Sequence, residues 1–308
     1  LRTYRDPIMP MDDTIFRAYD IRGIVPSQID SSFAFTLGRA IGTLARIRKQ
    51  EVIVTARDGR LSSDELQNAL NDGVISSGIG VIDIGMNPTP VLYFSALEIG
   101  TGSGIMVTGS HNPPEYNGFK IMLGGHTLFG KEIQELQDII LRQKLDSGQG
   151  FRIQKNALTD YLHRIISDIE ITRPLKIALD CGNGVTGVCA EKLFTNLGCE
   201  VIPLCSEVNG NFPNHHPDPS DPRNLTELIE AVDIYQCDAG FAFDGDGDRV
   251  GVITETLQIV YADRLLMRLA QDILYRNPDA TIIYDVKCSR HLGQIIEEAG
   301  GNALMWKT

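Results

Sequence analysis

The sequence contains no long apolar run and no excess of basic residues. No stretch approaches the roughly 18 consecutive apolar residues that a membrane-spanning helix requires. Residues 1–13 carry charges and prolines where a signal peptide would have its apolar core. Lys and Arg number 28 against 40 Asp and Glu, so the formal net charge is −12, and no Lys/Arg-rich tract offsets it locally. We therefore expect neither a membrane nor nucleic acid as a partner.

Cysteine is sparse and lacks the spacing of a metal or disulfide framework. The six cysteines include no C-x-x-C pair and lie at irregular intervals, at Cys181, Cys189, Cys199, Cys205, Cys237 and Cys288. This pattern predicts reduced thiols in a cytoplasmic protein, with neither a disulfide scaffold nor a zinc site.

The residues that are present predict an α/β protein. Hydrophobic residues make up 43% of the 308 and charged residues 22%, which is ordinary globular composition and enough length for two or three domains. Apolar residues at helical spacing predict helices over 32–50 and 63–77, and apolar runs predict strands over 52–54 and 81–84.

The same local pattern occurs three times along the chain. An apolar strand ending in a polar residue, a turn, a helix, a glycine and a second apolar strand follow one another from Val52, from Lys176 and again from Thr281. We interpret these segments as three related βαβ units in separate domains, against the alternative of three crossovers in one large sheet.

Polar, helix-breaking segments at 146–150 and 256–258 suggest the domain boundaries. They divide the chain into domains over 1–150, 151–257 and 258–308. The last has only about 50 residues, too few for a core like those of the first two. We therefore expect the third domain to be incomplete and the natural protein to be longer.

One candidate reactive segment is the loop Ser-His-Asn-Pro-Pro that follows the strand 104–109. The strand and the two prolines predict a fixed, exposed hydroxyl at Ser110, suited to a nucleophile or phosphate acceptor. A turn whose Ser and Asn side chains cap backbone groups remains the alternative. A Ser-His-Asp hydrolase is disfavoured, because the segment is not G-x-S-x-G and adjacent Ser110 and His111 are expected to point in different directions.

A second candidate is Asp-Gly-Asp-Gly-Asp-Arg, which lies between two apolar strands. Asp244, Asp246 and Asp248 alternate with glycines, so their oxygens can converge on one hard divalent cation. An EF-hand is excluded because Arg249 stands where that loop requires glycine. A phosphatase with Asp244 as nucleophile stays open as an alternative.

Two other segments are less specific. Arg22, in the stretch 16–23, could place a guanidinium over an anion, although such an arginine commonly serves in a structural ion pair. His215 and His216 lie in the Pro- and Asn-rich loop 210–222. Because no third His or Cys is near them in the sequence, a structural loop is favoured over a metal site.

Taken together, these segments resemble the α-D-phosphohexomutases, most closely the bacterial phosphomannomutase/phosphoglucomutase branch. The resemblance runs over the whole chain, through FRAYDIRGIV, ARDGRLS, VTGSHNPPEYNGFKIML, LDCGNGVTG, GNFPNHHPDP, FAFDGDGDRVGVI and YDVKCS. Phosphoglucosamine mutases, with an S-A-S-H-N-P type of loop, are a more distant match.

The resemblance implies that Ser110 carries a catalytic phosphate and, with Asp244, Asp246 and Asp248, holds Mg²⁺. It implies further roles for the surrounding polar residues. These are Lys120 as general acid/base, Arg22 and Arg249 as charge-stabilising groups, His111 and Asn112 beside the nucleophile, Lys287 facing the cleft and Tyr19 as a positioning residue.

The family fold has four related α/β domains around a cleft, and its sugar-reading G-E-x-S-G-H and phosphate-binding R-x-S-x-T segments are absent from this sequence. The implied activity is interconversion of hexose 1-phosphate and hexose 6-phosphate, for mannose or glucose, through a 1,6-bisphosphate. We expect the chain as given to be weakly active. An inactive phosphosugar- or cation-binding module is the non-enzymatic alternative. The sequence indicates no oligomeric state.

Overall fold

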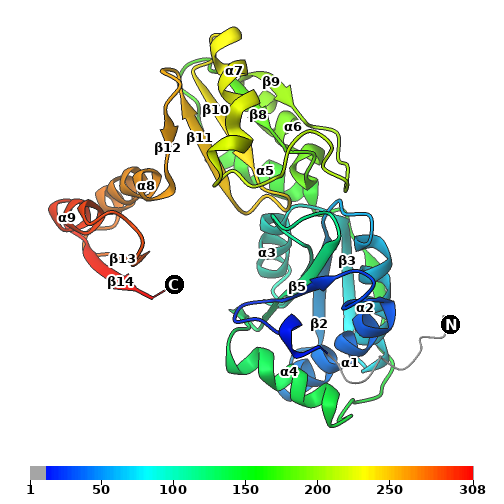
Figure 1. Cartoon of the computed structure of the whole chain (residues 1–308). Helices are drawn as coiled ribbons and strands as arrows, with labels where there is room; N and C mark the ends of the chain where they lie inside the picture. The colour runs from blue at the N-terminus through cyan, green and yellow to red at the C-terminus, as the bar shows by residue number, and fades with distance from the viewer. Residues whose placement is uncertain (1–11, 308) are drawn as a thin grey trace.

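The computed structural model describes residues 12–307 and divides them among three separate sheets (Figure 1). The first sheet has seven strands in the order β1-β5-β4-β2-β3-β7, with β6 paired to β5. Its elements are β1 (Ile21–Ile24), α1 (Ser31–Ile47), β2 (Val52–Arg57), α2 (Ser63–Ser76), β3 (Gly80–Met86), α3 (Thr89–Glu98), β4 (Gly104–Val107), β5 (Tyr116–Leu123), β6 (His126–Thr127), α4 (Lys131–Leu141) and β7 (Arg152–Gln154), preceded by a 3₁₀ turn at Asp13–Ile15.

Helices cover both faces of this first sheet. Side chains alternate between faces along a strand, so Ile53 of β2 packs with α1, α2 and α4, whereas Val54 packs with α3. Helices α1 and α2 cross closely because each has a glycine at the contact. A Cβ on Gly38 would lie 2.2 Å from the Leu70 carbonyl oxygen. The result is a three-layer α/β/α unit.

The second sheet has the order β12-β11-β10-β8-β9. Its unit consists of α5 (Leu158–Asp168), β8 (Lys176–Asp180), α6 (Ala190–Asn196), β9 (Glu200–Leu204), α7 (Thr226–Ile234), β10 (Ala239–Phe243), β11 (Val250–Thr254) and β12 (Ile259–Val260), with 3₁₀ turns at Val185–Val188 and Pro222–Leu225. Helix α5 packs on α3 of the first unit, where the rings of Phe94 and Tyr161 meet edge to face at 5.4 Å. The first two units therefore form one body.

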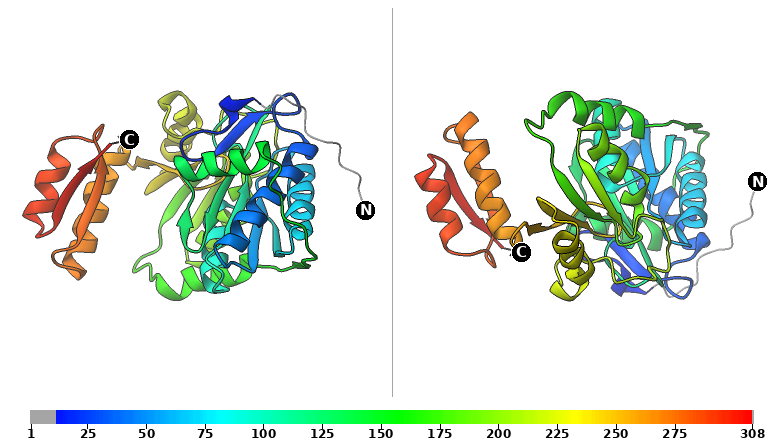
Figure 2. Two further views of the ribbon diagram at one scale, coloured as in Figure 1. Left: turned by 90° about the horizontal axis from the view of Figure 1, so that it is seen from below. Right: turned by 90° about the horizontal axis from the view of Figure 1, so that it is seen from above.

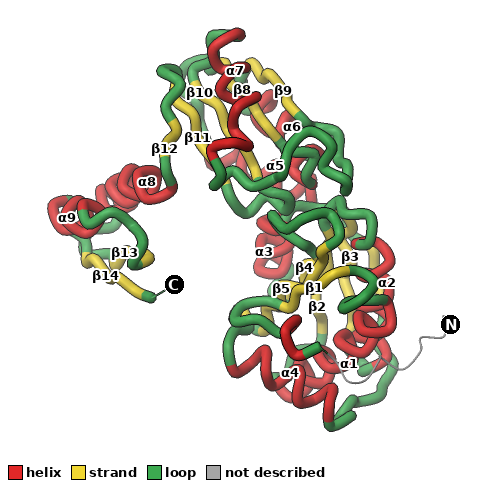
Figure 3. The backbone as a smooth tube through the Cα atoms, viewed as in Figure 1, coloured by secondary structure: helices red, strands yellow, loops and turns green. Residues whose placement is uncertain are grey.

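The third unit is small and stands apart from that body in all views (Figure 2). It consists of α8 (Ala262–Arg276), β13 (Thr281–Asp285), α9 (His291–Glu298) and β14 (Asn302–Trp306). Strands β13 and β14 form a two-stranded parallel sheet on which α9 packs. In the tube drawing the third unit follows directly from the end of β12 (Figure 3).

The predicted α/β architecture and its threefold repeat are confirmed. Strand pairs β2/β3, β8/β9 and β13/β14 are each parallel and each enclose one helix, and they lie in three different sheets. Strand β7 follows residue 150 and pairs with β3, and β12 follows residue 257 and pairs with β11, so each of these sheets takes one strand from beyond the turn used as a boundary. Among residues 12–307, no helix combines the length and apolar character needed to cross a membrane.

Candidate active site

Ser110 lies three residues after the end of β4, on a tight turn at the edge of the first unit. Its backbone has a φ of 49°, and its amide donates to Thr108 Oγ1 at 2.7 Å. The prediction of an exposed hydroxyl is wrong for this state, because Ser110 is only 1% exposed. The cause is the loop after β10, whose Asp244 Oδ2 accepts the Ser110 hydroxyl hydrogen bond at 2.9 Å.

Arg60, for which the sequence predicted no role, holds the Ser110 loop by hydrogen bonds. Its guanidinium donates to four backbone carbonyls, those of Ser110 (2.8 Å), Asn112 (2.6 Å), Pro113 (2.6 Å) and Tyr116 (3.0 Å). The Arg60 side chain is fully buried and lies 5.1 Å from the ring centroid of Phe212 in the second unit. One side chain therefore fixes the turn and touches the opposite unit.

Asp58 supports the same loop from the end of β2. Its Oδ2 accepts from Thr108 Oγ1 at 2.7 Å and from the Gly109 amide at 3.2 Å, and it pairs with Arg60 Nε at 3.3 Å. A buried carboxylate is stabilised only when its oxygens have such partners. Both residues belong to the segment ARDGRLS, which the sequence analysis used for the family resemblance without assigning it a role.

The Asp-Gly-Asp-Gly-Asp loop follows β10 and curls over Ser110. Asp244 Oδ1 accepts from the amides of Asp248 and Arg249, both at 3.1 Å, which closes the loop on itself. Gly245 makes the close approach possible, since a Cβ there would lie 2.3 Å from the Ser110 carbonyl oxygen. The glycine between the first two aspartates thus allows the two loops to dock.

The carboxylates of Asp244, Asp246 and Asp248 converge, with one oxygen of each within 4.8 Å of the others. Lys120, on β5, lies against them. Its Nζ donates to Asp246 Oδ2 at 2.7 Å and also to Asp248 Oδ2. Thr89 Oγ1 donates to Asp246 Oδ2 at 2.5 Å. The predicted metal residues are therefore brought together, and residues of the first unit complete the cluster.

The three carboxylates of the cluster outnumber the single positive charge of Lys120, and this shifts the pKa values of its members. Burial, together with the charges of Asp246 and Asp248, raises the pKa of Asp244 to about 8. Burial alone would raise the pKa of Asp246, but Lys120 outweighs it and lowers that pKa. In the same way, burial would lower the pKa of Lys120, and the two carboxylates raise it instead.

The donors present fit a hard divalent cation. All three side chains offer carboxylate oxygens, the ligands that Mg²⁺ prefers. Asp246 Oδ1 is buried and has no hydrogen-bond partner among the described residues, so one ligand atom is left free. A cation here would compete with Lys120 for the same oxygens.

His111 lies closer to Ser110 than expected. Its Nδ1 is 3.4 Å from Ser110 Oγ, so the prediction that adjacent Ser110 and His111 point apart is wrong. The positive φ of Ser110 turns the chain and brings the two side chains to the same side. Burial and then the charge of Arg249 lower the pKa of His111, which favours the neutral imidazole.

The remaining predicted residues differ in burial, and Arg22 and Asn112 are the two that are buried or half-buried. Arg22 is buried on β1 beside β5 and pairs with Asp20 at 2.5 Å. Asn112 Nδ2 donates to the Gly109 carbonyl at 3.1 Å, which is the capping role considered for this loop.

The other three are exposed. The Arg249 side chain borders an apolar hollow of about 470 Å³ between β11, β12 and α8. Tyr19 is 59% exposed, and Lys287 pairs only with Asp285 on the third unit among the described contacts. The structure does not bring Lys287 to Ser110.

His215 has its own group of polar neighbours. Folding brings Asp180 and Cys205 beside His215, although neither is near it in the sequence. His215 Nε2 lies 2.9 Å from Asp180 Oδ2. The Asp180 carboxylate, foremost by hydrogen bonding, raises the pKa of His215 to about 11.

Comparison with known proteins confirms the family resemblance of the sequence. Models of phosphoglucomutase/phosphomannomutase alpha/beta/alpha domains I and II match residues 13–146 and 159–257. A solved phosphoglucomutase/phosphomannomutase family protein from Burkholderia thailandensis superimposes with a TM-score of 0.94 at 49% identity, over 97% of this chain and 67% of that one. The chain belongs to the phosphoglucomutase/phosphomannomutase family.

Relatives in this family carry two kinds of name. The chain is 50% identical over 308 residues to a phosphomannomutase/phosphoglucomutase of Pseudomonas aeruginosa, covering all of this chain and 66% of that protein. It is also 50% identical over 296 residues to a phosphoglucomutase of Neisseria meningitidis, covering 96% of this chain and 64% of that protein. The chain thus spans about two thirds of the length of these family members.

Proposed function

We propose that this protein is a cytoplasmic Mg²⁺-dependent phosphohexomutase that interconverts the 1-phosphate and 6-phosphate of mannose or glucose. The observation that carries the proposal is the hydrogen bond from Ser110 Oγ to Asp244, made across the boundary between the first two units beside Asp246, Asp248 and Lys120. A hydroxyl that faces a carboxylate cluster and a lysine suits phosphoryl transfer better than any other use of these groups.

In the proposed cycle, Ser110 carries a phosphate on Oγ. A free hydroxyl of the bound hexose phosphate attacks that phosphorus as its proton passes to a base. The bond from phosphorus to Ser110 Oγ breaks, and Ser110 Oγ takes up a proton. Lys120 is the proposed proton carrier, because its Nζ donates to Asp246 and Asp248, whose carboxylates lie beside that of Asp244, the acceptor of the Ser110 hydroxyl. The hexose 1,6-bisphosphate then returns its other phosphate to Ser110, which completes the exchange.

The metal would be held by Asp244, Asp246 and Asp248 together with the phosphate on Ser110. When bound, Mg²⁺ supplies positive charge to the phosphoryl oxygens during transfer. The chain's own residues contribute orientation: Arg60 and Asp58 fix the loop that carries Ser110, and Asp244 fixes its hydroxyl. Positioning of this kind accounts for much of the rate of phosphoryl transfer.

Cationic groups around Ser110 support an anionic, phosphorylated substrate. After the larger effect of burial, the positive charges of Arg249 and Arg22 lower the pKa of His111, the residue that follows Ser110. A net charge of −12 does not oppose this, since a local patch of positive charge governs attraction into a site. Asn112, Tyr19 and Lys287 are proposed to position the sugar.

A coupled assay with glucose 1-phosphate or mannose 1-phosphate, primed with the matching 1,6-bisphosphate, tests the proposal. The 6-phosphate should form with the wild-type chain and not with Ser110→Ala. Ser167→Ala, at an exposed serine of α5, is the matched control and should behave as wild type. Glucosamine 6-phosphate is included to test the phosphoglucosamine mutase alternative.

Two outcomes would contradict the proposal. Turnover that survives Ser110→Ala but not Asp244→Asn would indicate an aspartate-nucleophile phosphatase. Sugar phosphate binding with neither turnover nor phosphorylation of Ser110 would indicate a binding module.

A further inference from the structure

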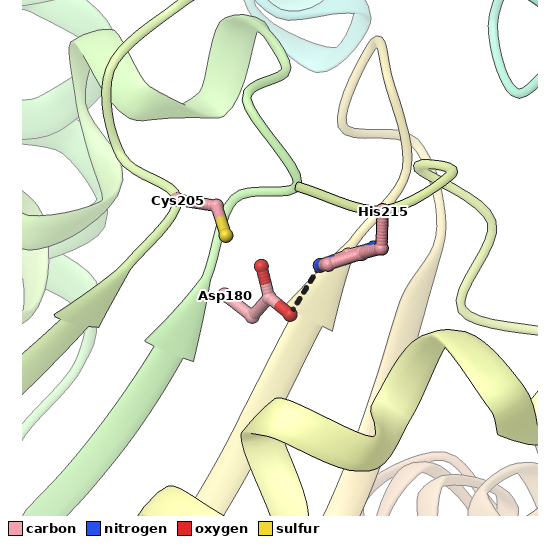
Figure 4. A group of neighbouring side chains, drawn as sticks. All are labelled: Asp180, Cys205 and His215. Carbon is pink, nitrogen blue, oxygen red and sulfur yellow. Dashed lines mark hydrogen bonds and ion pairs between the residues drawn. The ribbon is translucent and has the colours of Figure 1, made fainter. Parts of the chain in front are cut away.

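A second group of metal-binding side chains lies on the second unit, apart from the aspartate cluster (Figure 4). Asp180 ends β8, and Cys205 follows β9 directly. Because β8 and β9 are parallel neighbours with Asp180 opposite Leu204, their carboxyl ends bring Asp180 and Cys205 together. The loop after β9 then returns and directs the His215 ring at the Asp180 carboxylate, which lies between His215 and Cys205 (Figure 4).

The ligand atoms are close enough to share one ion. A carboxylate oxygen of Asp180, the sulfur of Cys205 and a ring nitrogen of His215 all lie within 4.8 Å of one another. With metal–ligand distances of about 2.0–2.3 Å, ligands on a common tetrahedral ion are separated by roughly 3–4 Å. Side-chain rotations alone can bring the three ligand atoms from within 4.8 Å of one another to the separations of a bound ion.

Asp180 and His215 contact one another, and each also makes a hydrogen bond to the backbone. Asp180 Oδ1 accepts from the Gly182 amide at 2.8 Å, which leaves Oδ2 facing His215. His215 Nδ1 lies 3.0 Å from the His216 carbonyl oxygen, so that nitrogen carries the hydrogen and Nε2 is directed at Asp180. A backbone carbonyl on the far ring nitrogen is the usual support of a metal-binding histidine.

We propose that Asp180, Cys205 and His215 bind a Zn²⁺-class transition-metal ion. Thiolate, imidazole and carboxylate together favour zinc over magnesium, which prefers oxygen ligands only. Glu227 Oε2, 3.9 Å from Cys205 Sγ, or a water would supply the fourth ligand. Binding releases the thiol proton of Cys205 and the proton shared by His215 and Asp180, so it is accompanied by loss of two protons.

The proposed ion would hold the His215 loop in place and would take no part in phosphoryl transfer. The loop that carries His215 continues to Pro217, which lies against Gly182 and against Gly245 of the aspartate loop. A metal joining His215 to β8 and to the end of β9 would hold this loop against Gly245, the glycine that packs on the Ser110 carbonyl. The site is independent of the proposed function, since no residue of the phosphoserine cluster belongs to it.

Titration of the purified chain with Co²⁺ tests the proposal, because a cobalt–thiolate bond produces a charge-transfer absorption band that oxygen ligands cannot give. We expect the band to saturate near one equivalent and Zn²⁺ to displace the cobalt. Cys205→Ser should abolish the band and weaken Zn²⁺ binding by more than about 100-fold, since loss even of outer-shell partners costs 10–100-fold. Cys237→Ser, a buried cysteine elsewhere in the second unit, is the matched control and should retain the band.

A variant with Asn at positions 244, 246 and 248 separates the two metal sites, and it should keep the thiolate band. If Cys205→Ser does not fold, protection of Cys205 from alkylation by Zn²⁺ in the wild-type chain, located by peptide mass spectrometry, replaces it. Absence of the band, its persistence in Cys205→Ser, or its loss in the aspartate variant would each overturn the proposal. In the first case, Asp180 and His215 form only an ion pair.

Discussion

At the scale of single residues, the turn that carries Ser110 is held by two side chains from the segment after β2. The Arg60 guanidinium donates to four carbonyl groups of the Ser110 turn. The Asp58 carboxylate accepts from Thr108 and Gly109, the two residues before Ser110. A guanidinium can satisfy several acceptors in one plane, whereas an ammonium group cannot reproduce that fork. The turn is thus held by geometry that only arginine supplies.

We expect Arg60→Lys to slow phosphate transfer from a hexose 1,6-bisphosphate to Ser110 by about 100-fold, because displacement of a reacting group by about 1 Å costs that much. Single-turnover rapid quench measures the rate. The control is Arg57→Lys, at an arginine whose ion pair with Asp64 is partly exposed, and it should leave the rate unchanged. Equal rates for wild type and Arg60→Lys would exclude a positioning role.

Burial also determines which thiols react. It raises the pKa of Cys181 to about 11 and that of Cys189 to about 12. At pH 8 only about one thiol in a thousand, or fewer, is then ionised, and the thiolate is the reactive form. In metal-free protein we expect iodoacetamide to label half-buried Cys205 and Cys288 before Cys181 and Cys189, as measured by peptide mapping. Labelling in denaturant should erase the order, and an unchanged order there would contradict the explanation.

At the scale of elements, two loops from different sheets form the site, and a glycine determines how closely they meet. Gly245→Ala would direct a methyl group at the Ser110 carbonyl oxygen, 2.3 Å away, so the loops must separate. We expect a loss of about 1–3 kcal/mol in unfolding free energy, as for other overpacked sites, with a drop in phosphorylation of Ser110. Urea denaturation and phosphate incorporation measure the two effects.

Gly104→Ala is the comparison for that variant. Its Cβ would lie 3.3 Å from the Leu92 side chain, which can shift, and it is expected to remain phosphorylated. If Gly245→Ala kept both the stability and the phosphorylation of wild type, close docking of the loops would not be required.

Sequence alone predicted what depends on local pattern. The βαβ repeats follow from apolar periodicity and glycine positions, and the Ser110 and Asp244 loops follow from motifs at strand ends. Contacts between distant segments were not predictable, because no local pattern records them. Thr89 reaches Asp246, and Cys205 reaches His215, only after the sheets form. The buried state of Ser110 was likewise missed, since a separate unit covers it.

At the scale of the whole molecule, the aspartate cluster joins two units of the chain. Asp246 belongs to the second unit, whereas its partners Thr89 and Lys120 belong to the first. Because a cation would replace Lys120 at these oxygens, it would stabilise the aspartate loop itself and would join the two units only through the phosphate proposed on Ser110. Ligand binding to the folded state raises its stability by mass action, by about 2.7 kcal/mol at 100 times the Kd.

We accordingly expect Mg²⁺ to raise the thermal unfolding temperature relative to the chelator-treated protein. Asp246→Asn should remove most of that increase. Differential scanning calorimetry with and without Mg²⁺ measures it. Asp233→Asn, at the end of α7 and outside the cluster, is the control and should respond as wild type. An unchanged response in the Asp246 variant would locate the metal elsewhere.

The most direct test of the account is the position of covalent phosphate on the protein. After incubation with glucose 1,6-bisphosphate and Mg²⁺, peptide mapping should find one acid-stable phosphate, on Ser110, and none in Ser110→Ala. Phosphate that is labile to hydroxylamine and attached to Asp244 would contradict the account and identify the aspartate as the nucleophile.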